Sequence, residues 1–165
     1  MRLDKLLLCV IAASPNHQIE GKKRVHKTLY LSQCAGESVP ASFYIKHFGV
    51  FSDELAETLA FLSTFSYLDT AETRVGANNY FATVFQTPSP QDYACPPRLK
   101  AIVDLLSRES TPVLEVASTI AYFEETGLSE KVAEQKTKDM KPAIANTSNI
   151  QQSRKLLADL RAVHA

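Results

Sequence analysis

One stretch of this 165-residue sequence has the pattern of a β-hairpin, and it limits the folds that the chain can adopt. Residues 73–75 and 80–85 are rich in β-branched and aromatic side chains, and residues 76–79 between them are Gly-Ala-Asn-Asn, a turn composition. On both sides of this hairpin, apolar residues recur at helical spacing. The sequence therefore predicts an α+β fold that is mostly α.

Helix signals precede the predicted hairpin. Residues 2–13 are dense in good core-helix residues, and a second apolar stripe runs from Lys22 to Cys34. Alternation over residues 41–48 predicts an extended segment, and Ser52 is placed to cap a helix that carries leucines at helical spacing. With the hairpin, residues 1–87 follow an order that predicts a winged-helix-like lobe.

Four prolines between residues 88 and 97 mark the best boundary in the chain. Beyond this connector, apolar stripes predict helices over 98–108, 113–126 and about 148–163, and Ser129 is placed to cap one more. Residues 98–165 are therefore expected to form a helical lobe. The chain is short enough for both lobes to make one compact unit.

Charge and hydropathy exclude several classes of protein. The 18 Lys and Arg residues balance the 18 Asp and Glu residues, so no overall field attracts nucleic acid or an anionic membrane. No stretch approaches the roughly 20 apolar residues of a membrane span. The apolar run before Cys9 is too short for a signal peptide, and Cys9, Cys34 and Cys95 form no C-x-x-C pair. These features predict a cytoplasmic protein with reduced thiols.

No common catalytic signature is present in the sequence. A phosphate loop, a dinucleotide fingerprint, H-E-x-x-H and G-x-S-x-G are all missing, and the four histidines are widely separated. Neighbouring acids, such as those at 53–54 and 124–125, point in different directions on a helix. The sequence therefore predicts no catalytic residues, no metal site, no cofactor and no enzymatic activity.

One local concentration of charge stands out at the start of the second predicted helix. It consists of Lys22, Lys23, Arg24 and Lys27. Three interpretations stay open: a solvated helix face, phosphate contacts with nucleic acid, or contacts with an acidic protein partner. Several aromatic residues interleave with aliphatic residues at element spacing and are interpreted as core rather than as an exposed stacking platform. They are Tyr30, Phe43, Tyr44, Phe48, Phe51 and Tyr67.

Two segments carry a family resemblance. Residues 21–31, Gly-Lys-Lys-Arg-Val-His-Lys-Thr-Leu-Tyr-Leu, and residues 43–52, Phe-Tyr-Ile-Lys-His-Phe-Gly-Val-Phe-Ser, resemble the YwgA-like family of uncharacterised prokaryotic proteins. More distantly, the chain is similar to Panacea (SocA-like) domains, which share an aromatic-Gly-Pro-x-Ser element and are associated with toxin neutralisation. Val50 stands where that element has proline. The resemblance implies regulation or defence-type partner binding, whereas Gly49 and Ser52 suit structural roles in a turn and a helix cap.

Two hypotheses of function follow. The first is a non-enzymatic regulatory or adaptor protein, antitoxin- or defence-associated, that acts by binding another protein. The alternative is a winged-helix transcriptional regulator that binds double-stranded DNA through Lys22, Lys23, Arg24 and Lys27 or through the helix after Ser52. A homodimer through the C-terminal helices fits a chain of this size, although no sustained heptad supports it.

Overall fold

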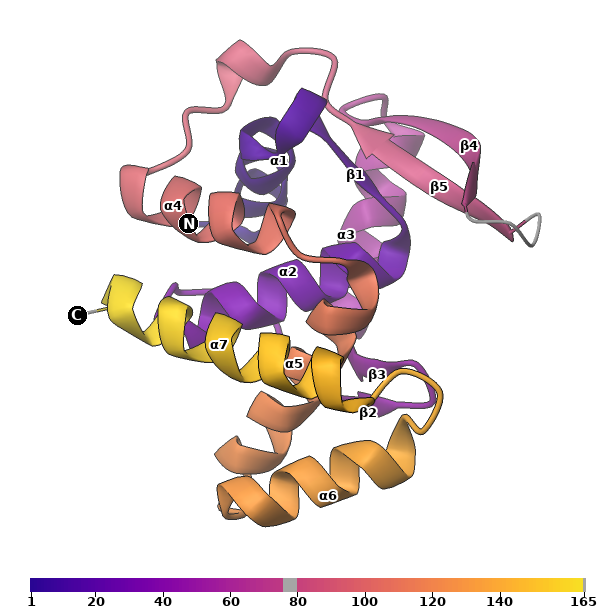
Figure 1. The fold of residues 1–165 in the computed structure, drawn as a ribbon. Helices are drawn as coiled ribbons and strands as arrows, with labels where there is room; N and C mark the ends of the chain where they lie inside the picture. Colours follow the sequence, from indigo (N-terminus) through magenta and orange to yellow (C-terminus); the bar gives the residue numbers. More distant parts are fainter. Residues whose placement is uncertain (76–79, 165) are drawn as a thin grey trace.

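The computed structural model describes residues 1–75 and 80–164. Within these residues seven α-helices accompany five short strands, which confirms the α+β, mostly α class (Figure 1). The turn predicted at 76–79 lies outside the described residues. The two stretches on either side of it do form an antiparallel pair, which confirms the strands of the predicted hairpin.

Residues 1–75 and 80–86 form three α-helices and the five strands that the structure describes. In chain order these elements are α1 (Leu3–Ala13), β1 (Gln18–Glu20), α2 (Lys22–Cys34), β2 (Tyr44–Lys46), β3 (Gly49–Phe51), α3 (Asp53–Thr64), β4 (Asp69–Val75) and β5 (Tyr80–Gln86). A short 3-10 helix, Pro15–His17, lies between α1 and β1. The three α-helices begin within one residue of the positions that the sequence predicts.

After β5, the regular elements among residues 87–164 are all helices, as the sequence predicts. They are the short 3-10 helix Pro90–Asp92 and then α4 (Pro97–Ser107), α5 (Thr111–Glu125), α6 (Glu130–Met140) and α7 (Thr147–His164). Serine caps open two of the predicted helices, because Ser52 Oγ accepts a hydrogen bond from Leu55 N and Ser129 Oγ accepts one from Val132 N.

The strands form two separate antiparallel sheets. In the larger sheet, β5 lies between β1 and β4, and the β4–β5 hairpin extends away from the helices (Figure 1). In the smaller sheet, β2 pairs with β3. Two details differ from the sequence prediction. Of the predicted extended segment 41–48, only Tyr44–Lys46 form a strand, and this strand is the first half of the small hairpin. Strand β1 was not predicted, because three residues carry too little periodicity.

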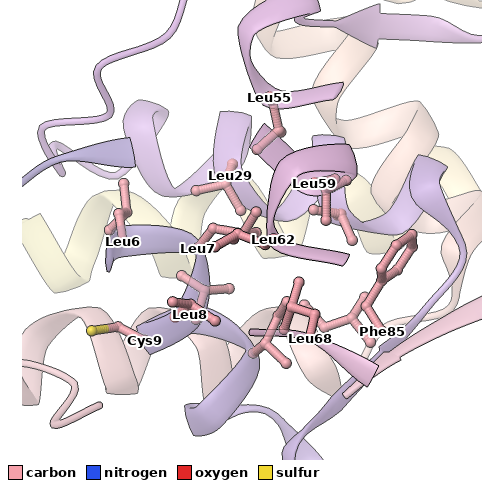
Figure 2. Packing of buried hydrophobic residues seen from close by; sticks show 14 of the residues in the cluster. Leu6, Leu7, Leu8, Cys9, Leu29, Leu55, Leu59, Leu62, Leu68 and Phe85 are labelled. Carbon is pink, nitrogen blue, oxygen red and sulfur yellow. The ribbon is translucent and has the colours of Figure 1, made fainter. Parts of the chain in front are cut away.

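The first hydrophobic core joins α1, α2, α3 and the large sheet. Figure 2 shows leucines of these helices meeting Phe85 of β5, which pairs with Ile19 of β1. Residues 6–12 of α1 are all buried, because other elements cover the helix on every side. Burial of such aliphatic side chains supplies most of the stabilisation of this region.

The second hydrophobic core is centred on α5. It contains buried residues of α2, α4, α5 and α7, including Leu31, Leu114, Ile120 and Leu157. Helices α2 and α4 contribute to both cores, since Leu29 and Leu99 belong to the first and Leu31 and Leu106 to the second. The division into lobes at 88–97 stays a prediction.

Candidate functional site

The four cations predicted as contact residues all lie on α2, but their surroundings differ. Lys22 and Lys23 are exposed at the start of the helix. Arg24 is half-buried, and Lys27 is 1% exposed. Only Lys22 and Lys23 are therefore accessible at the surface, and Lys23 already lies 3.5 Å from the Glu115 carboxylate.

Lys27 is an internal anchor for the β2–β3 hairpin. Its Nζ donates hydrogen bonds to the carbonyl oxygens of Phe48, at 3.0 Å, and Val50, at 2.7 Å. Burial lowers the pKa of Lys27 to about 8, against the opposing effect of the Glu115 carboxylate. This placement changes the role that we assign to Lys27, because a buried ammonium cannot reach a phosphate or an acidic partner.

A second buried lysine extends this network. Lys141 Nζ lies 3.3 Å from Glu115 Oε1 and donates to the carbonyl oxygen of His47 at 3.4 Å. Lys23 Nζ approaches the same Glu115 oxygen at 3.5 Å. The network connects α2, α5, the end of α6 and the β2–β3 hairpin. Sequence reasoning missed Glu115 and Lys141 because they lie far from Lys27 in the chain.

Gly49 has the structural role that the sequence suggested. Its φ of +89° lies in the region that favours glycine, and an added Cβ would meet Thr119 Oγ1 at 3.5 Å, an ordinary contact. We expect Gly49→Ala to lower the free energy of unfolding by about 1–2 kcal/mol through backbone strain alone.

Urea denaturation measures this loss. Gly127 is a matched control, because its φ is +93° and a Cβ would meet nothing within 4 Å. A similar loss in Gly127→Ala would assign both effects to the backbone. An unchanged stability of Gly49→Ala would contradict the assignment.

His26 holds the start of α3 through Ser52. Ser52 N donates to His26 Nδ1 at 3.2 Å, and the imidazole stacks on Phe51 with the ring centroids 4.3 Å apart. Burial, together with the charges of nearby lysines, lowers the pKa of His26 to about 4. The imidazole is therefore neutral at physiological pH, which leaves Nδ1 free to accept the bond.

Arg24 connects α2 to the junction of α4 and α5. Its guanidinium donates to the carbonyl oxygens of Leu106, Ser107 and Glu109, the last at 2.7 Å, and to Thr111 Oγ1 at 3.2 Å. These are carbonyls at a helix C-terminus, where a cation is favourable. The guanidinium of Arg24 therefore mainly stabilises the packing of α2 against the α4–α5 junction.

A groove separates the exposed lysines from the β4–β5 hairpin. Its volume is about 580 Å³, and its lining includes Lys22, Lys23, Tyr80 and Phe81. Tyr80 is 75% exposed and Phe81 is 56% exposed, with the Arg74 guanidinium 5.7 Å from the Phe81 ring centroid. This groove is where the predicted basic contact would have to form.

Helix α3 carries a second surface, which combines acidic and aromatic residues. We define the α3 face as Glu54, Glu57, Phe61, Phe65 and Tyr67, all exposed. The ring centroids of Phe61 and Phe65 are 4.7 Å apart, and those of Phe61 and Tyr67 are 6.5 Å apart. Neighbouring aromatic side chains in solvent are typical of binding surfaces.

The interpretation of Tyr67 and Phe48 as core residues was wrong. Tyr67 is 50% exposed and Phe48 is 64% exposed. Sequence reasoning also missed Phe61 and Phe65. A signal was present, because the core stripe Leu55, Leu59 and Leu62 leaves position 61 on the opposite side of the helix.

Comparison with known proteins does not identify a family for this chain. A scan against protein-family models and a search of curated proteins both found no match. The resemblance to the YwgA-like family and to Panacea domains therefore stays a prediction.

Two further findings concern metal ions and membranes. No group of three or more His, Cys, Asp and Glu side chains within residues 1–75 and 80–164 is placed to hold a metal ion. Among the helices that the structure describes, none is long and apolar enough to cross a bilayer.

Proposed function

We propose that this chain is a cytosolic, non-enzymatic regulatory or adaptor protein that acts by binding another protein. The observation that carries the proposal is the α3 face. There, Phe61, Phe65 and Tyr67 lie together in solvent beside Glu54 and Glu57. Clustered exposed aromatic side chains provide the anchors of protein interfaces, and the acids around them make the surface selective.

The alternative, a DNA-binding regulator, is supported by topology and by one surface. With the β2–β3 hairpin as an insertion between α2 and α3, the order α1, β1, α2, α3, β4, β5 and a sheet with β5 in the middle favour a winged-helix-like N-terminal lobe. The groove with Lys22 and Lys23 lies beside the hairpin that would be the wing.

Charge on α3 argues against the DNA alternative. The helix contains Asp53, Glu54 and Glu57 and no Lys or Arg, and Lys46 already pairs with Asp53 at 3.2 Å. Carboxylates on the helix that would enter a groove repel the phosphates on either side. The two exposed lysines of α2 would have to provide most of the attraction.

Affinity capture with the intact chain as bait tests the proposal. We expect a specific protein partner that is retained by the wild type and by Lys22→Glu/Lys23→Glu. The triple variant Phe61→Ser/Phe65→Ser/Tyr67→Ser should lose this partner, because the exposed anchors are gone. Circular dichroism checks that both variants remain folded, which is expected since all five side chains are exposed.

Fluorescence anisotropy with random-sequence duplex DNA decides between the two hypotheses. Salt-sensitive binding that Lys22→Glu/Lys23→Glu abolishes would favour the DNA alternative. Loss of the protein partner in the lysine variant, with retention in the aromatic variant, would contradict our assignment of the binding surface.

A further inference from the structure

A groove lies between the start of α1 and the exposed side of α3. Its volume is about 530 Å³, within the roughly 300–1,000 Å³ typical of ligand pockets. Three carboxylates line it, from Asp4, Glu54 and Glu57, and three apolar side chains, from Leu3, Pro40 and Phe61. Arg2 and Thr58 complete the lining. The groove thus combines negative charge with an apolar floor.

The carboxylates are not neutralised within the fold. Arg2 pairs with Asp4 at 2.9 Å, which leaves two carboxylates against no further cation in the lining. A hydrogen bond from its own backbone N–H, followed by the one from Ser52 Oγ at 2.9 Å, lowers the pKa of Glu54, so it is ionised at neutral pH. The side-chain carboxylate of Glu57 makes no hydrogen bond or ion pair in the part of the chain that the structure describes.

Phe61 belongs both to the groove and to the α3 face. Phe61 lines the groove, is 49% exposed, and its ring also lies beside those of Phe65 and Tyr67. An aromatic ring surrounded by carboxylates favours a cation over its face, in addition to apolar contacts. The groove and the α3 face therefore form one continuous surface.

We propose that this surface binds a lysine- or arginine-rich segment of a partner protein, with an apolar side chain of that segment seated against Leu3, Pro40 and Phe61. The inference rests on the proposed protein-binding function and specifies the partner by its chemistry. We choose a basic segment because of charge complementarity. Its cations would be attracted by the two unneutralised carboxylates, whereas an acidic segment would be repelled by them.

Fluorescence anisotropy with a labelled peptide of lysine and leucine tests the proposal, and a peptide of glutamate and leucine is the matched probe. We expect the intact chain to bind the basic peptide, more weakly as salt is raised, and not to bind the acidic one. The dissociation constant should rise about tenfold or more in Phe61→Ala and in Glu57→Lys, as for residues at the centre of an interface.

Control variants lie on α6, at the opposite end of the molecule from α1 (Figure 1). Val132→Ala removes a side chain that is 44% exposed, and Glu130→Lys makes the same charge change as Glu57→Lys. Both controls should bind the basic peptide like the wild type. Thermal unfolding confirms that each variant keeps its fold.

Several outcomes would overturn the inference. These are equal binding of both peptides, equal losses in the α6 controls, or a wild-type dimer that Phe61→Ala dissociates, which would make a second copy the occupant. If the basic peptide fails to bind while the affinity capture retains a partner through the aromatic residues, the basic-segment inference fails alone. If the capture also fails, the proposed function fails with it.

Discussion

Lys27→Met is expected to lower the free energy of unfolding by about 2–4 kcal/mol, because the carbonyl oxygens of Phe48 and Val50 lose a charged donor inside the protein. Methionine fills a similar volume without supplying an N–H group. The β2–β3 hairpin would then be held mainly by its own strand pairing and by Lys141. Lys27→Met should therefore be among the most destabilising substitutions of a polar residue in this chain.

Urea denaturation of both proteins at neutral pH measures the difference. Lys22→Met is the matched control, since Lys22 lies on the same helix but is exposed. Its free energy of unfolding should stay within about 0.5 kcal/mol of the wild type. Equal stability of Lys27→Met and the wild type would show that the two carbonyl oxygens find other donors and that Lys27 is not an anchor.

Acid should destabilise the wild type through His26. The pKa of His26 is lowered from 6.5 to about 4 in the folded protein, so the unfolded chain binds a proton at a higher pH than the folded one. The contribution of neutral His26 is fully present above pH 6.5 and is lost as the pH falls toward 4. The difference between these two pKa values corresponds to about 3 kcal/mol.

The physical cause is a competition for Nδ1. A proton on this atom would remove the acceptor for Ser52 N, and the folded protein would have to bury the added charge beside Phe51. Loss of the bond affects α3 directly, because Ser52 is its N-cap. The α3 face would therefore be among the first regions to change in acid.

Unfolding of the wild type and His26→Gln by urea at both ends of this pH window tests the prediction. The variant keeps a side-chain acceptor but cannot take up a proton, so its stability should fall less between pH 6.5 and 4. His47→Gln is the control, because His47 is exposed, and it should behave like the wild type. Parallel losses in all three proteins would contradict the role of His26.

Local signals predicted most of the secondary structure. Ser52 with its leucine stripe predicted α3, Ser129 predicted the start of α6, and β-branched and aromatic residues predicted β4 and β5. These signals succeeded because capping and periodicity depend on residues within a few positions of one another. Strand β1 could not be predicted in this way, because its three residues owe their strand conformation to pairing with β5.

The candidate site was less predictable. The sequence shows four cations at the start of one helix, but it does not show that Lys27 faces the hairpin carbonyls or that Arg24 reaches the end of α4. It places Phe61 off the leucine stripe of α3, but it does not show that Phe61 is 49% exposed or that it lies beside Phe65 and Tyr67. Exposure depends on how distant segments pack, whereas the local pattern indicates only which side of a helix is more apolar.

The sequence by itself determined the α+β, mostly α class, the helix starts and the balanced charge. Each of these follows from composition or from contacts between near neighbours in the chain. Only the tertiary structure decided which charges are internal, because Lys27, Glu115 and Lys141 meet from separate elements. It likewise decided which aromatic side chains face solvent, since burial depends on the whole fold and local patterns constrain it only weakly.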